Sequence, residues 1–279
     1  MNGTRTQPMD RRSAITWTSF PWQGLVIGVL TGLLSGLLGI GGGVVIVPAL
    51  IAMLAMEQKL AHGTSLAATL PVASASLVTY WFGGHVDWPV AGCLAAGAIF
   101  GALAGTHLLQ IVPKRPLTMI FVAVILLTAI RLLVAEDAMG RETLSVVGAF
   151  ALVAIGFVTG TLSGLVGIGG GVVMIPAMVV LFGVPPVVAK GTSVAVIVPS
   201  SLVGTIRNRT NRNADLRAAV AIGATGIPCA VLGGLIARSI SDVVSNVLFA
   251  ILLVIVAIMQ IRTLRSPDLE PVGDVPPVV

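Results

Sequence analysis

Long apolar runs separated by short polar breaks follow one another along almost the whole chain. They lie at roughly 22–38, 44–56, 64–83, 89–112, 116–135, 144–166, 172–184, 192–206, 216–238 and 243–262. Most are close to the length of a membrane-spanning helix, which needs about 20 apolar residues. The pattern predicts an all-α polytopic membrane protein with helical segments throughout and no separate soluble domain.

The two halves of the chain carry the same motif in the same register. Residues 32–50 read GLLSGLLGIGGGVVIVPAL and residues 160–178 read GTLSGLVGIGGGVVMIPAM, with 14 of 19 positions identical at an offset of 128. The register continues without a gap to HGTS at 62–65 and KGTS at 190–193. Duplicated halves with broken helices are typical of secondary transporters. Because each half holds an odd number of segments, we expect two inverted-topology repeats.

The repeats and the polar stretches around them divide the chain into five parts. We expect a cytoplasmic N-terminal segment at 1–21, a first transmembrane repeat at 22–135, a linker at 136–143, a second repeat at 144–262 and a disordered cytoplasmic tail at 263–279. Twelve of the 16 Lys and Arg residues fall on the side of the two termini. The positive-inside rule therefore places both termini in the cytoplasm of a multi-pass protein of the cell (inner) membrane.

Composition supports the membrane and excludes other classes. Apolar residues make up 56% of the chain and charged residues 10%, with a mean hydropathy of +1.03. A soluble domain carries about 25% charged residues. The net charge of +5 does not indicate nucleic acid, because the basic residues sit at the ends of apolar segments. Two cysteines inside apolar stretches supply neither a disulfide framework nor a metal cluster, and no cofactor is expected.

The second segment of each half is too short to cross a bilayer as a helix. The 13 residues of 44–56 span about 20 Å, against about 30 Å of hydrocarbon. The first two segments of each half therefore form either a re-entrant hairpin, with the glycine turn at its tip, or two full crossings. Charge counting leaves both arrangements open.

Three consecutive glycines interrupt an apolar stretch in each half. Non-helical backbone is tolerated at membrane depth only where protein buries it or it lines a wet cavity. The helices that follow, from about Val44 and Val172, present unpaired N–H groups and a positive dipole end. Glycines let a ligand approach this backbone closely, which favours a small anion. The candidate ligands at the two breaks are Ser35, Gly41, Gly42, Gly43, Ser163, Gly169, Gly170 and Gly171.

Tight helix packing is the alternative explanation for the glycines. Gly24, Gly28, Gly32 and Gly36 recur every four residues, and Gly156, Gly160, Gly164 and Gly97, Gly101, Gly105 form similar ridges. Small residues at this spacing let two helices approach closely. Packing accounts for these ridges but not for three glycines in a row, which weaken any helix.

The paired HGTS and KGTS stretches form a second candidate group. His62 and Lys190 occupy equivalent places, where each brings positive charge toward a shared anion site. The hydroxyls of Thr64, Ser65, Thr192 and Ser193 are further candidate donors to that anion. Two other interpretations stay open: the hydroxyls cap helix starts, and Lys190 anchors the topology.

The remaining polar residues argue against cation transport and catalysis. None of the 11 acids lies in the middle of an apolar segment, although cation pumps and proton relays usually need such a carboxylate. A hydrolase with Ser35 or Ser163 as nucleophile needs one base, but the serine is duplicated and the candidate bases His85 and His107 are not. We therefore do not expect an enzyme.

The duplicated G-x-x-G-x-G-G-G segments, 36–43 and 164–171, each followed by V-V-x-x-P-A, resemble the TauE/SafE family of sulfite and sulfonate exporters. The resemblance covers roughly residues 22–262. It implies a permease for small sulfur-containing anions such as sulfite, sulfoacetate and isethionate. It fixes neither the substrate nor the direction of transport.

Together, the repeat and the resemblance predict a secondary transporter that moves a sulfur oxyanion by alternating access. The expected partners are the anion, membrane lipid, an H⁺ or Na⁺ coupling ion and a second copy in a homodimer. Two alternatives remain open: a passive anion channel, and a transporter of a small organic anion without sulfur.

Overall fold

The computed structural model describes residues 20–108, 145–166, 170–210 and 213–265, together with the isolated positions 119, 122, 123, 126 and 130. These residues contain helices and no strand, which confirms the predicted all-α class. In chain order, the helices are α1 (Phe20–Leu38), α2 (Gly43–Leu54), α3 (Gln58–Phe82), α4 (Trp88–Leu108), α6 (Val146–Val166), α7 (Gly171–Phe182), α8 (Pro186–Thr210), α9 (Leu216–Ser239) and α10 (Asp242–Arg265).

Most predicted segment ends lie within a few residues of the observed helix ends. α2 and α7 begin at Gly43 and Gly171, one residue before the expected positions. α1 begins at Phe20, two residues before the expected segment start, and α10 ends at Arg265, three residues after the expected end. The linker 136–143 and most of the segment 116–135 lie outside the described residues.

Two predicted helix starts are wrong. The sequence suggests helices that begin at Thr64 and Thr192, whereas α3 begins at Gln58 and α8 at Pro186. Polar side chains in the added turns, including Lys190, shorten the apolar runs and conceal these turns. Proline suits the first helical position because no N–H is needed there. HGTS and KGTS therefore lie inside α3 and α8 and do not cap them.

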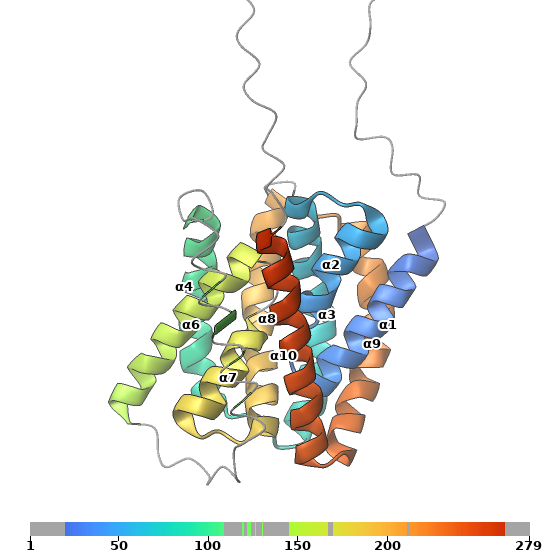
Figure 1. Ribbon diagram of the computed structural model, residues 1–279. Helices are drawn as coiled ribbons and strands as arrows, with labels where there is room; N and C mark the ends of the chain where they lie inside the picture. Colours follow the sequence, from blue (N-terminus) through green and yellow to red (C-terminus); the bar gives the residue numbers. More distant parts are fainter. Residues whose placement is uncertain are drawn as a thin grey trace, which may run out of the picture.

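Several helices have the length and apolar character of membrane spans. Within the described residues, four segments are long and apolar enough to cross a membrane: Leu60–Phe82, Val146–Ser163, Pro186–Thr210 and Leu216–Ala237. α2 and α7 have 12 residues each, about 18 Å of helix, and neither reaches across about 30 Å of hydrocarbon alone. Figure 1 shows them in opposite halves of the bundle, α2 above and α7 below.

Each half packs its first helix onto the fourth helix of the other half. α1 lies along α9, and α6 lies along α4, with α3 and α8 between these pairs (Figure 1). A Cβ at Gly32 would lie 2.2 Å from the carbonyl oxygen of Gly226, and one at Gly160 would lie 2.2 Å from that of Ala98. These two contacts are related by the offset of 128 residues. The predicted packing role of these glycine ridges is confirmed.

Two reciprocal hydrogen bonds also join the halves. The N–H of Asp215 donates to Thr64 Oγ1 at 2.9 Å, and the N–H of Asp87 donates to Thr192 Oγ1 at 3.0 Å. Each threonine lies near the start of α3 or α8 and reaches the loop that follows the end of the other helix. α3 and α8 therefore run antiparallel, the relation that an inverted repeat requires. The insertion of whole halves in opposite orientations stays a prediction.

Candidate substrate site between the two halves

The first glycine break needs glycine because of its backbone. Gly39, Gly41 and Gly42 have φ of 70°, 71° and 79°, a left-handed region that glycine enters without the steric cost of a Cβ. α2 starts directly after Gly42, and no side chain caps it. The positive end of the α2 dipole therefore begins at buried glycine backbone.

The second break is described only from its last two glycines. Gly170 precedes α7 with φ of −56°, and no side chain caps this helix either. Gly169 lies outside the described residues. The two halves thus share an uncapped short helix, whereas the left-handed turn is described in the first half.

The two breaks lie against each other in the interior. A Cβ at Gly171 would lie 3.1 Å from Ile40 Cα and 3.2 Å from the carbonyl oxygen of Gly39. Ile197 of α8 borders both breaks, with its Cδ1 3.0 Å from the Cβ positions of Gly41 and Gly171. The starts of α2 and α7 are therefore brought to one place beside the middle of α8.

Lys190 and Ser193 bring α8 to the first break. Ser193 Oγ donates to the carbonyl oxygen of Gly39 at 2.6 Å, and it lies 2.8 Å from that of Lys190. A Cβ at Gly39 would lie 2.6 Å from Lys190 Cβ. Gly39 is thus needed both for its backbone conformation and for this close approach.

The Lys190 side chain points into the bundle. It is 1% exposed, its Nζ donates to Ser245 Oγ of α10, and it lies 5.7 Å from the centre of the Phe249 ring. A topology anchor extends its ammonium to the membrane surface, so this geometry does not fit the anchor interpretation. Among the described residues, Lys190 is the one buried side chain that carries a charge.

The other HGTS and KGTS residues serve the contact between the halves. Gly63 and Gly191 admit backbone oxygens: an added Cβ would lie 2.0 Å from Asn213 O or 2.1 Å from His85 O. Thr64 and Thr192 accept the reciprocal hydrogen bonds described above. His62 is half-buried and Ser65 is buried.

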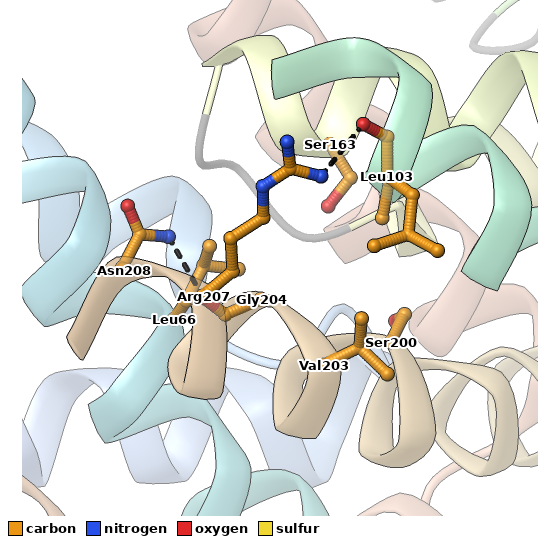
Figure 2. A pocket seen from close by; sticks show the side chains of 9 residues that line it. Leu66, Leu103, Ser163, Ser200, Val203, Gly204, Arg207 and Asn208 are labelled. Atoms are coloured by element: carbon orange, nitrogen blue, oxygen red, sulfur yellow. Dashed lines mark hydrogen bonds between the residues drawn. The ribbon is translucent and has the colours of Figure 1, made fainter. Parts of the chain in front are cut away.

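The serines before the two breaks have different surroundings. Ser35 Oγ lies 3.1 Å from Ser76 Oγ in a buried pair. Ser163 lines a narrow pocket between α4, α6 and α8 with Leu66 of α3, shown in Figure 2. Arg207 crosses this pocket and donates from Nη1 to the carbonyl oxygen of Leu103 at 2.9 Å.

Sequence reasoning missed several polar residues of this region. Ser245 and Ser76 pair with predicted site residues, but neither belongs to a duplicated motif. Arg207 lies in a cluster of basic residues that topology already explains. Its repeat counterpart, Thr79, is neutral. This difference in charge between equivalent positions could have singled out Arg207.

Comparisons with known proteins identify related membrane proteins. The sequence model of the family described as Sulfite exporter TauE/SafE matches residues 4–132 and 152–278. A protein named "Probable membrane transporter protein YunE" from Bacillus subtilis (strain 168) is 28% identical over 241 residues, 78% of this chain and 87% of that protein. A "Probable membrane transporter protein" from Xylella fastidiosa (strain 9a5c) is 28% identical over 241 residues, 84% of this chain and 92% of that protein.

A further relative matches about half of the chain. "Probable membrane transporter protein YjnA" from Bacillus subtilis (strain 168) is 32% identical over 133 residues, 47% of this chain and 49% of that protein. No solved structure matches the chain. The resemblance suggested by the two glycine motifs is confirmed. Because the family model matches both halves, this multi-pass membrane protein belongs to the TauE/SafE family.

Proposed function

We propose that the chain is a secondary transporter that moves a small sulfur-containing anion, sulfite or a C2 sulfonate such as sulfoacetate or isethionate, across the cytoplasmic membrane by alternating access. The observation that carries this proposal is the meeting of the two glycine breaks beside a buried lysine. The family described as a sulfite exporter supports the sulfur chemistry.

The chemistry of the meeting point favours an anion. The starts of α2 and α7 lack side-chain caps, so their first-turn N–H groups and dipoles favour negative charge. Lys190 adds a full positive charge in the same region, and its described hydrogen-bond acceptor, Ser245, is neutral. No carboxylate is buried among the residues whose side-chain exposure the structure describes, although a cation pathway usually requires one.

The arrangement of the halves supports alternating access. The first helix of each half packs on the fourth helix of the other half, and α3 and α8 lie antiparallel between these pairs. Rocking or gating of one repeat against the other would expose a site between the two breaks to one side at a time. The proposal includes cytoplasmic termini, an H⁺ or Na⁺ coupling ion where uptake occurs, and a homodimer.

The direction of transport follows the membrane potential unless an ion is coupled. Export of each negative charge gains about 2.3 kcal/mol per 100 mV when the inside is negative. Export therefore needs no coupling ion, whereas uptake needs at least one cation for each negative charge carried.

The test is solid-supported-membrane electrophysiology on proteoliposomes of the full chain. The panel is sulfite, sulfate, thiosulfate, sulfoacetate, isethionate, taurine and acetate, each with and without Na⁺ or a pH step. We expect a saturable current with one or a few sulfur anions. Current that does not saturate would indicate a channel, and a preference for acetate would indicate a non-sulfur substrate. Absence of both current and tracer flux for the whole panel would overturn the proposal.

A further inference from the structure

The pocket that Arg207 lines with Ser163 and Ser200 is called the Arg207 pocket below. In the first half, the Tyr80 ring fills the corresponding place. Under the offset of 128 residues, Ser163 corresponds to Ser35, Gly204 to Ser76 and Asn208 to Tyr80. The Tyr80 ring is 2% exposed, and its hydroxyl donates to the carbonyl oxygen of Gly36 at 2.9 Å. The second half has smaller side chains at two of these three positions, and the pocket lies there.

The pocket and the filled counterpart lie at opposite ends of the central helix pair. Tyr80 is near the end of α3, which stops at Phe82, and Arg207 is near the end of α8, which stops at Thr210. These two helices run antiparallel, as the reciprocal threonine contacts show. The bundle therefore has a pocket at one end and a tyrosine in the corresponding place at the other.

The pocket leads toward the two glycine breaks. Ser200 lines it and lies three residues after Ile197, about 4.5 Å along the helix axis. Ile197 is the side chain that borders Gly41 and Gly171. Ser163 lines the pocket from α6, shortly before the second break.

Arg207 provides the chemistry for an oxyanion in this pocket. It is the one charged residue among those that line the pocket, which also include Ser163, Ser200 and Asn208. A guanidinium has five N–H donors, and one of them is used on the neutral carbonyl of Leu103. The bond to Leu103 has a charged donor but a neutral acceptor, whereas an oxyanion adds the opposite charge and can accept two parallel guanidinium N–H groups. An arriving anion therefore competes well for the Arg207 side chain.

The pocket is too small for the anion while Arg207 crosses it. The free space is about 10 Å³, room for about one water molecule. Figure 2 shows the guanidinium extending across the pocket from α8 to Leu103 of α4. The pocket widens only when this contact opens, so the same residue that attracts the anion also closes its path.

We propose that the Arg207 pocket is the access site through which a small sulfur oxyanion reaches the two glycine breaks, that Arg207 is its gate, and that Tyr80 is the closed gate at the opposite end. The inference rests on the proposed transport function and adds two residues to it. It assigns to Arg207 a role in ligand access beyond membrane topology.

Thiol labelling of the full chain tests the Arg207 gate without requiring transport. Cys93 and Cys229 are first replaced by Ser, and Ser200→Cys places one thiol in the pocket. The probes are two methanethiosulfonates of similar size, the anionic 2-sulfonatoethyl and the cationic 2-(trimethylammonio)ethyl reagent. We expect the anionic reagent to react at least tenfold faster, relative to the rates of the two reagents with a free thiol, and isethionate to slow it.

The matched variants are Arg207→Gln and Arg209→Gln. Arg209 lies on the same helix two residues away, is exposed and does not line the pocket. We expect Arg207→Gln to remove most of the anion preference and Arg209→Gln to keep it. An unchanged preference in Arg207→Gln, equal loss in both variants, or no labelling by either reagent would overturn the proposal.

The Tyr80 gate has its own test at the position equivalent to Ser200, which is Val72. We expect Val72→Cys to stay unreactive while Tyr80 is present and to react after Tyr80→Ala. Tyr80→Phe is the matched control because it keeps the ring and loses the hydrogen bond, and it should leave the thiol unreactive. Reaction of Val72→Cys with Tyr80 in place would contradict a closed gate.

The labelling results and the transport currents fail independently. If no sulfur anion is carried but the Arg207-dependent preference holds, the pocket stands as an anion site and the proposed function falls. If currents occur but labelling does not depend on Arg207, the transport function stands and the gate falls.

Discussion

The HGTS and KGTS segments make the same contacts with the opposite half, but their first residues have different surroundings. In both, the glycine admits a backbone oxygen and the threonine accepts an N–H from an aspartate. Lys190 is buried against Ser245 and Phe249, whereas His62 is half-buried. The shared residues make the contacts between the halves, and the unequal residues give the two halves different surroundings at this position.

The same division applies at the ends of α3 and α8. The packing glycines recur at the offset of 128 residues and make matching contacts. Tyr80 and Asn208 are equivalent in sequence, yet one fills its place and the other borders a pocket. Matching backbone contacts thus surround side chains that differ between the halves, and the proposed access path uses this difference.

The largest loss of stability is expected where the backbones of the two halves meet. Gly63→Val and Gly191→Val each place side-chain atoms about 2 Å from a carbonyl oxygen, and overpacking of this kind costs about 3 kcal/mol or more. We expect both variants to lose folded protein in size-exclusion profiles of detergent extracts. Gly92→Val is the control, because a Cβ there meets nothing within 4 Å. A well-folded Gly191→Val protein would show that the contact with His85 is not needed.

Transport should be lost when an added side chain separates the two glycine breaks. Gly171→Ala places a Cβ 3.1 Å from Ile40 Cα in the opposite break, so we expect a folded protein with a current at least about tenfold lower, about 1.4 kcal/mol. Gly92→Ala, where a Cβ meets nothing within 4 Å, is the control and should transport normally. Equal currents in the two variants, measured at equal protein density, would remove the meeting point from the mechanism.

The charge of Lys190 should affect affinity more than stability. Lys190→Met keeps an unbranched side chain and removes the ammonium. Loss of a hydrogen bond to a charged group costs about 1.5–3 kcal/mol, which corresponds to a KM roughly 10–100-fold higher. His62→Met is the matched variant and should change KM less. A KM unaffected by Lys190→Met in sulfite concentration series would assign the lysine to packing with Ser245 and Phe249 alone.

The smallest effect should be the same in both halves. Thr64→Val and Thr192→Val each leave one aspartate N–H without its hydroxyl acceptor. An unsatisfied donor of this kind lowers the free energy of unfolding by about 1–3 kcal/mol. We expect similar falls in the thermal midpoint of the detergent-solubilised protein, with currents retained. A lower thermal midpoint in one variant only would show that the two contacts do not stabilise the protein equally.

The sequence predicts the scaffold better than the site. Apolar run lengths place most helices, and the two glycine runs place the starts of α2 and α7 within one residue. Spacing cannot tell that α1 packs on α9, because partner choice depends on contacts between distant residues. It also misplaced Thr64 and Thr192 at helix starts, whereas both lie inside helices and their hydroxyls accept an N–H from a loop of the opposite half.

The polar partners in the interior were the least predictable part. Ser245 and Tyr80 have no motif around them, and their roles come from the positions of Lys190 and Gly36 in the folded chain. Differences between equivalent positions of the two halves would have indicated some of these residues. Positions where the repeat places a charge opposite a neutral residue, or a large ring opposite a small side chain, are the ones that the structure connects with the proposed anion path.

The most direct test of the central claim is to locate a bound anion. Crystals of the full chain would be grown with 2-bromoethanesulfonate, a C2 sulfonate whose bromine gives an anomalous signal, and compared with Lys190→Met crystals grown in the same way. We expect a bromine peak between Gly41, Gly171 and Lys190 that is lost in the variant. A peak only at the protein surface, or an interior peak unaffected by Lys190→Met, would contradict the claim.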